Sequence, residues 1–143
     1  MKLSTRSRYG VRLMIELALN HQNGFMQLST ISQKQDISLK YLGQIVIQLK
    51  GAGLVMSGRG KNGGYSLSKS PSDINLRQVV EVLEGGISLV ECIPDSDCSR
   101  AGVCVTREIW KQLSDDMASK LEKISLQYLA DKSAADAANN YCI

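Results

Sequence analysis

The stretch DISLKYLGQIVIQLKGAGLVMSGRGKNGGYSLS, residues 36–68, decides the fold. Its first three residues have the composition of a turn, and Ser38 is well suited to cap a helix that runs to about Ala52. Gly53 then ends the helix. Two short runs with strand alternation flank a glycine-rich tip at residues 59–64, which predicts a β-hairpin. The apolar side chains that recur with helical spacing form the inward stripe of the helix: Leu42, Ile45, Val46 and Leu49.

The residues before this stretch predict two more helices. Residues 25–28 form a short extended piece, and Ser29 is expected to cap a brief helix at residues 30–34. The order helix, short helix, turn, helix and β-hairpin is that of a winged helix-turn-helix, which we assign to residues 1–70. The fold class is mainly α with a small β-hairpin wing. An amphipathic first helix over residues 5–20 is indicated by apolar side chains at a period near 3.6, namely Tyr9, Leu13, Met14, Leu17 and Ala18.

The C-terminal half predicts a different organisation. Residues 71–86 hold a linking helix after the boundary at Pro71, and residues 87–104 form a loop without periodicity. Residues 105–131 form a long helix and a short terminal helix, and residues 132–143 are expected to form a flexible tail. We expect the long helix to pack against its copy in a homodimer; the alternative is that it lies across the first domain. Its apolar stripe recurs every four residues, at Ile109, Leu113, Met117 and Leu121.

Charge is divided unevenly between the two halves. Residues 1–69 carry ten Lys and Arg against two acidic residues, whereas residues 70–143 carry seven against twelve. A basic half of this kind favours a polyanionic partner, with chance clustering of surface charge as the alternative. Without a signal-peptide core or a long apolar run, we expect a cytoplasmic protein with no membrane partner. With one histidine, no Walker-type loop and no dinucleotide fingerprint, we expect neither an enzyme nor a small-molecule substrate.

A recognition helix presents the side chains of its N-terminal part to base edges in the major groove of double-stranded DNA. Glutamine can pair with adenine, lysine can reach guanine acceptors, and serine can contact a base or a phosphate. The alternatives are that the serine only caps its helix, that the tyrosine packs on the wing, and that the other side chains are solvated surface. The residues expected to contact the major groove are Ser38, Lys40, Tyr41 and Gln44.

Basic residues outside this helix extend the expected DNA surface. The hairpin tip supplies Arg59 and Lys61, and arginine suits a narrow, electronegative minor groove. Arg8 lies near the start of the first helix, where it is expected to contact a phosphate and so to position the protein without reading sequence.

Cys92, Cys98 and Cys104 follow the spacing C-x5-C-x5-C. On one continuous helix, successive thiols would lie about 120° apart in projection and about 9 Å apart along the axis, so they could not bind one centre. The segment therefore has to be an irregular loop around whatever it binds. Three thiolates favour a soft metal centre, either an iron–sulfur cluster or zinc. A thiol switch and unconnected cysteines are the other interpretations.

The chain resembles the Rrf-type family of bacterial winged helix-turn-helix transcription regulators. The likeness runs in register from MKLSTRSRYGVRLM through ISLKYLGQ and the RG..GGY wing, then through the three cysteines to the LSD segment of the long helix. It implies a homodimer that binds promoter DNA and responds to iron–sulfur status. It also implies that Cys92, Cys98 and Cys104 hold a [2Fe–2S] cluster, with [4Fe–4S] as the alternative because related nitric-oxide sensors use one. The implied targets are genes of iron–sulfur cluster biogenesis.

The chain departs from the family's pattern in both functional regions. The resembled member has serine and glutamate where this chain has Lys40 and Gly43, a change expected to alter target discrimination. Its histidine three residues after the third cysteine is replaced by Arg107, whose guanidinium cannot ligate a metal. Nitric-oxide sensors of the family use an acidic residue where this chain has Arg8. The candidates left for a fourth ligand are an exogenous thiol or water, Glu108, Asp95, Asp97 and Cys142.

Overall fold

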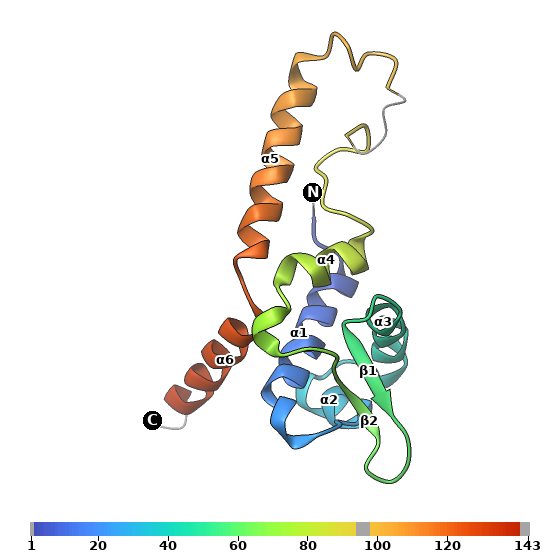
Figure 1. Ribbon diagram of the computed structural model, residues 1–143, viewed down its shortest axis with the longest axis vertical. Helices are drawn as coiled ribbons and strands as arrows, with labels where there is room; N and C mark the ends of the chain where they lie inside the picture. Colours follow the sequence, from blue (N-terminus) through green and yellow to red (C-terminus); the bar gives the residue numbers. More distant parts are fainter. Residues whose placement is uncertain (1, 94–97, 141–143) are drawn as a thin grey trace.

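The computed structural model describes residues 2–93 and 98–140 (Figure 1). Short 3-10 helices, η1 and η2, follow α1 and precede α4. In chain order the elements are α1 Thr5–Leu19, η1 His21–Asn23, α2 Leu28–Gln35, α3 Leu39–Gly51, β1 Val55–Gly58, β2 Gly64–Leu67, η2 Pro71–Asp73, α4 Leu76–Glu84, α5 Val105–Glu122 and α6 Leu126–Asn140. This order confirms the winged helix-turn-helix and the mainly α fold class.

One apolar core joins the helix-turn-helix to the linking helix. The predicted inward stripe of α3 is buried, as is that of α1 except for the half-buried Tyr9, and α4 adds Val79 and Leu83 to the core. Gly10 lies where α1 crosses α4, and a Cβ at this position would collide with the Leu83 side chain. The first 70 residues are therefore not packed by themselves, because α4 closes their core. The beginning of α6 completes it with Leu126 and Ala130.

The wing is a two-stranded antiparallel sheet held on the helical body by a short segment before α2. Val55 pairs with Leu67 and Gly58 with Gly64, so the tip contains Arg59 to Gly63. Met26 pairs with Tyr65, and the two residues exchange backbone N–H···O bonds of 2.8 Å each. The extended piece predicted around residues 25–28 thus becomes a bridge to the wing.

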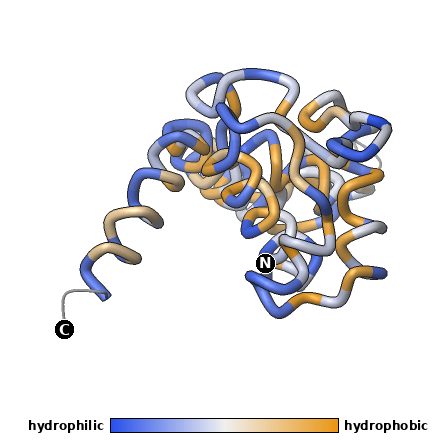
Figure 2. The backbone as a smooth tube through the Cα atoms, turned by 90° about the horizontal axis from the view of Figure 1, so that it is seen from below, coloured by the Kyte–Doolittle hydropathy of each residue, from blue (hydrophilic) through white to orange (hydrophobic). Residues whose placement is uncertain are grey.

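Two helix boundaries differ from the expectations. The helix α2 begins at Leu28 rather than after Ser29, because Gln27 is extended and its carbonyl already accepts from the N–H groups of Thr30 and Ile31. The terminal helix was expected to be short, with a tail from Lys132, yet α6 continues to Asn140. Alanine has the highest intrinsic helix propensity, and four alanines in residues 132–140 extend the helix. Figure 2 shows this part of α6 running out from the body.

The helix α5 contacts the winged body near its C-terminal end, where Glu122 pairs with Arg77 of α4 at 3.1 Å. It projects away from α1 and α4, and its first turns and the preceding segment lie at the opposite end of the molecule from the wing (Figure 1). No helix in the described part of the chain is long and apolar enough to span a membrane.

Candidate nucleic-acid interface and cysteine segment

The recognition helix α3 separates an apolar face from a polar face. The four residues of its inward stripe are at most 1% exposed, whereas Lys40 and Gln44 are exposed. The Ser38 hydroxyl accepts a bond from the Tyr41 N–H at 3.1 Å, which confirms that Ser38 caps the helix. The hydroxyl proton is still free to be donated outward. The apolar face of α3 thus packs in the core, and the opposite, polar face is exposed and can contact a ligand.

Tyr41 is the only proposed DNA-contacting residue of α3 with an aromatic partner in the described chain. Its ring meets that of Tyr9 edge-to-face, with centroids 5.8 Å apart and planes at 81°. Arg12 lies over the Tyr9 ring, 5.3 Å from its centroid. The ring contact of Tyr41 is therefore with α1, which joins the start of the recognition helix to the first helix.

A polar network fixes α1 against the end of α2. Arg12 donates from Nε to Oε1 of Gln35 at 2.8 Å and also to the Gln35 carbonyl. Gln35 in turn donates to Oε1 of Glu16 at 2.6 Å, and Lys34 pairs with the other carboxylate oxygen at 3.4 Å. Glu16 is only 7% exposed, so its charge is satisfied inside the fold. The network sets the angle at which α2 leads into the turn before α3.

The wing presents its basic residues at an exposed tip. Arg59 and Lys61 are both exposed. Below the tip, a Cβ on Gly58 would lie 2.8 Å from the Phe25 ring. Gly64 has φ of 139° and lies against the Met26 carbonyl, an arrangement that only glycine accepts. These contacts fix the base of the hairpin and leave the tip to reach outward.

Arg8 lies in the first turns of α1 and is exposed, with its guanidinium donating to the Thr5 hydroxyl at 3.2 Å. The beginning of α1 is at the other end of the winged domain from the wing tip (Figure 1). The structure therefore spreads the predicted contacts along the domain instead of gathering them in one patch.

The cysteine segment connects α4 to α5. The three thiols Cys92, Cys98 and Cys104 are free and partly exposed. Cys104 immediately precedes α5, and its Sγ lies 3.3 Å from Oγ1 of Thr106. The Thr106 hydroxyl, assisted by the N–H of Arg107, lowers the pKa of the Cys104 thiol below its usual value. Cys104 is thus biased toward the thiolate, the form that binds metals.

Two hydrogen bonds fasten this segment to α5. The Leu89 N–H donates to Oγ of Ser114 at 3.0 Å, and that hydroxyl donates to the Trp110 carbonyl at 2.8 Å. Arg107 donates from Nε to the Cys92 carbonyl at 3.3 Å. Ser114 is only 3% exposed, so the first contact is shielded from water.

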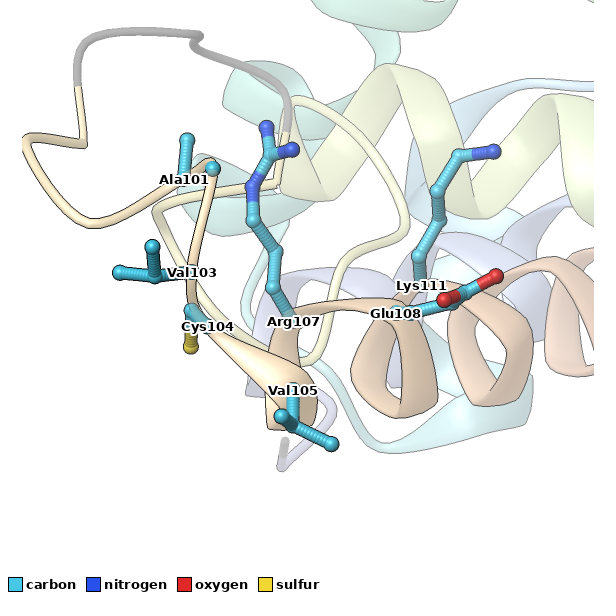
Figure 3. A pocket seen from close by; sticks show the side chains of 8 residues that line it. Ala101, Val103, Cys104, Val105, Arg107, Glu108 and Lys111 are labelled. Carbon is cyan, nitrogen blue, oxygen red and sulfur yellow. The ribbon is translucent and has the colours of Figure 1, made fainter.

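Arg107 occupies the position where a fourth ligand was sought. Its guanidinium and the Cys104 thiol point in opposite directions from the start of α5 (Figure 3). Glu108 and Lys111 lie beside each other along a cavity of about 560 Å³ that Cys104 also lines. Asp95, Asp97 and Cys142 are outside the described residues. Within the described ranges, no three histidine, cysteine or acidic side chains are gathered around a common metal position.

The cysteine segment is also tied to the DNA-binding domain through α4. The carboxylate of Glu84, the last residue of α4, accepts the Ser4 N–H at 2.8 Å. The Ser7 hydroxyl and this N–H lower the pKa of Glu84, while partial burial opposes them. Ser4 caps α1. The end of α4 and the beginning of α1 are thus held together just before the chain enters the cysteine segment.

The fold, the exposed edge of α3 and the basic wing tip together define a DNA-binding winged-helix protein. A family model described as an iron-dependent transcriptional regulator, Rrf2, matches residues 3–132. The chain belongs to the Rrf2 family of transcriptional regulators.

Two differently named transcriptional regulators, CymR and IscR, are similar to the chain over nearly its whole length. CymR of Bacillus subtilis is 41% identical, with 91% of this chain and 90% of the relative covered. IscR of Aliivibrio salmonicida is 36% identical over 98% and 89% of the two chains. The solved structure of CymR, the global cysteine regulator of B. subtilis, has a TM-score of 0.77 at 40% identity and covers 92% of this chain and 98% of that one. Both relatives are named as transcriptional regulators. The family description is iron-dependent, whereas the solved B. subtilis relative is described as a cysteine regulator.

Sequence reasoning did not single out three contacts that shape these sites. These are the Tyr9–Tyr41 ring pair, the Leu89–Ser114 bond and the Glu84–Ser4 bond, and each joins residues that are far apart in the chain. Ile47, an apolar residue of α3 that is 69% exposed, was not singled out either. A helical projection gives the signal for Ile47, because this apolar side chain lies opposite the buried stripe.

Proposed function

We propose that this protein is a homodimeric, DNA-binding transcription regulator that senses iron–sulfur status through a [2Fe–2S] cluster on Cys92, Cys98 and Cys104, and that it controls genes of cluster biogenesis. The observation that carries the proposal is the presence of three free thiols between α4 and α5, each outside the helices. The Leu89–Ser114 bond ties this stretch to α5, and the Glu84–Ser4 bond ties the end of α4 before it to α1.

The donor set fits such a group in kind: the three cysteines would fill three ligand positions, and the fourth would come from one of the candidates named above. Iron–sulfur clusters are held by cysteine thiolates, and hydrogen bonds and exposure set their reactivity. When bound, the cluster would supply a centre sensitive to iron supply, oxidants and nitric oxide. The Thr106 hydroxyl favours the thiolate of Cys104. Because the described thiols are not gathered, the segment has to close around its ligand, and ordering of this segment is the expected consequence of binding.

The contacts on either side of the segment supply a route to the DNA-binding surface. Arg107 and Ser114 hold the segment on α5. Glu84 holds the preceding helix on the N-terminus of α1, and the Tyr9 ring of α1 rests on Tyr41 of the recognition helix. A change in how the segment is held therefore acts on the same helices that orient α3 and the wing.

The exposed side of α5 supports the homodimer. Ile109, Trp110 and Leu113 are 48%, 38% and 46% exposed in the isolated chain. Large apolar side chains gathered on one part of a projecting helix favour a partner surface. A second copy is the natural partner, since two winged domains can then read two half-sites related by a two-fold axis.

For DNA binding we propose major-groove contacts from Ser38, Lys40, Tyr41 and Gln44. The wing residues Arg59 and Lys61 would contact the minor groove or its phosphates, and Arg8 a phosphate. All are exposed or partly exposed, and the half of the chain that contains them is strongly basic. Binding to duplex DNA should weaken steeply as salt is raised, because contacts with phosphates release counterions.

The test is an absorption spectrum with iron, acid-labile sulfide and zinc counts after anaerobic purification. Visible bands with equal iron and sulfide support the proposal, and replacing Cys98 with Ala should abolish them. Cys142→Ser tests this cysteine as the fourth ligand, because altered bands would assign it to the cluster and unchanged bands would exclude it. The matched control is Ser133→Ala, in α6, which should keep the bands. A colourless protein with one zinc per chain refutes the cluster. A ratio of four irons per chain would instead indicate a [4Fe–4S] centre.

A cluster-free thiol switch is the second candidate. It is favoured by the likeness to the B. subtilis cysteine regulator and by the lowered pKa of Cys104. It predicts a metal-free protein in which mild oxidation joins two of the three thiols. Mass spectrometry of the alkylated protein would detect this disulfide, and the change in DNA affinity on oxidation would be reversed by a reductant.

A further inference from the structure

Ile47 is the most exposed apolar residue of the recognition helix; Leu39, in the first turn, is 51% exposed. Four other apolar residues of α3, Leu42, Ile45, Val46 and Leu49, are at most 1% exposed, whereas Ile47 is 69% exposed. Single exposed apolar residues are common on protein surfaces, so exposure alone decides nothing. The position of Ile47 among its neighbours on the helix is more informative.

At 100° per residue, Ile47 projects between Gly43 and Gln44, and within about 20° of Lys40. All four therefore lie within one arc of about 100°, opposite the buried stripe. The rise of the helix places Ile47 about 10 Å beyond Lys40 along this edge. This edge carries Lys40 and Gln44, two of the side chains proposed to enter the major groove.

The neighbours of Ile47 suit DNA better than a protein partner. Lys40 and Gln44 bring a positive charge and an amide, and the domain around them is basic. At Gly43, one turn before Ile47, an added Cβ would have no atom within 4 Å, so the surface beside Ile47 is open. A single isoleucine in a polar, basic edge is too small an apolar patch for a protein interface.

The major groove offers one apolar group to such a side chain, the C5-methyl of thymine. We propose that Ile47 packs against a thymine methyl in the bound site and so determines sequence preference at that base pair. The inference rests on the proposed placement of α3 in the major groove. Ile47 would thus recognise a base although its side chain has no hydrogen-bonding group.

The test uses duplexes selected from a random pool by the wild-type protein. Each thymine is then replaced singly by deoxyuridine, which removes the methyl and keeps every hydrogen-bonding group. We expect one replacement in each half-site to weaken wild-type binding about fourfold, the contribution of one buried methyl. Ile47→Ala should bind the thymine and deoxyuridine duplexes equally at that position, and Ile47→Val should retain part of the difference.

The matched control is Tyr128→Ala, which removes a 57% exposed apolar side chain from α6 and should keep the full preference for thymine. Thermal unfolding of Ile47→Ala should match the wild type because the side chain is exposed. Wild-type binding that ignores every deoxyuridine replacement overturns the inference, as does an Ile47→Ala variant that keeps the preference. Absence of salt-sensitive duplex binding would instead refute the proposed function.

Discussion

Replacement of Gly43 with alanine should stabilise the recognition helix and weaken its binding to DNA, so it tests both properties. Gly43 lies in the interior of α3, and an added Cβ would meet no atom within 4 Å. Alanine is about 1 kcal/mol more favourable than glycine inside a helix. Because no clash offsets this gain, Gly43→Ala should raise the free energy of unfolding by about 1 kcal/mol. For a chain of 143 residues, this corresponds to a Tm about 3 °C higher.

The same methyl group should weaken DNA binding. Gly43 lies at one end of the outward arc that also carries Lys40 and Gln44, so a Cβ there holds the helix backbone farther from the base edges. Losing about 1 kcal/mol of contacts corresponds to about fivefold weaker binding. The assays are thermal unfolding followed by circular dichroism, and fluorescence anisotropy with a labelled duplex at constant salt.

Gly51 provides the matched control for helix propensity. It is the last residue of α3 and is equally open, so Gly51→Ala should also stabilise the fold, by a smaller amount. A lower Tm for Gly43→Ala would show that the fold itself needs glycine at this position. A higher Tm with unchanged affinity would refute the close approach of DNA to Gly43.

Three further predictions concern other contacts. Leu113→Asp should convert the dimer to a monomer in chromatography with light scattering, and a dimer that persists would exclude the exposed α5 face as the interface. Glu84→Gln should cost about 1 kcal/mol at pH 7 by weakening charge-assisted bonds to Ser4 and Ser7. The lowered pKa stabilises the fold above the ordinary value of 4.5, so the difference from wild type in urea titrations should shrink as pH falls below it, and a growing difference would contradict the assignment. Arg59→Ala should weaken duplex binding at least fivefold with an unchanged Tm, because it removes one exposed charge-assisted contact; unchanged binding would remove Arg59 from the interface.

Local signals predicted most of the winged domain. The stripe of α3, the cap at Ser38 and the glycine-rich tip each depend on residues within a few positions of one another, and the structure confirms all three. The predicted start of α2 was wrong because Ser29, the second residue of the helix, resembles a cap. The extent of α6 was wrong because alanine propensity outweighed the polar residues beside it.

The arrangement of the sites was less predictable because it depends on contacts between distant residues. The residues near Tyr41 in the sequence do not predict that its ring will contact Tyr9. Those near Leu89 do not predict its hydrogen bond to Ser114, 25 positions away. The cysteine spacing indicated a loop and a choice of soft centres. The spacing cannot distinguish an iron–sulfur cluster from zinc, because the same three thiolates can bind either one.

The attachment of the cysteine segment to α5 has a consequence for how such regulators diversify. Both fastenings use main-chain atoms of the segment, the N–H of Leu89 and the carbonyl of Cys92. Any residue offers a carbonyl, and any residue except proline offers an N–H. The side chains after Leu89 can therefore change while both hydrogen bonds to α5 are kept. Evolution, or a designer building chimeras, can therefore exchange the cysteine segment while the winged domain is kept unchanged.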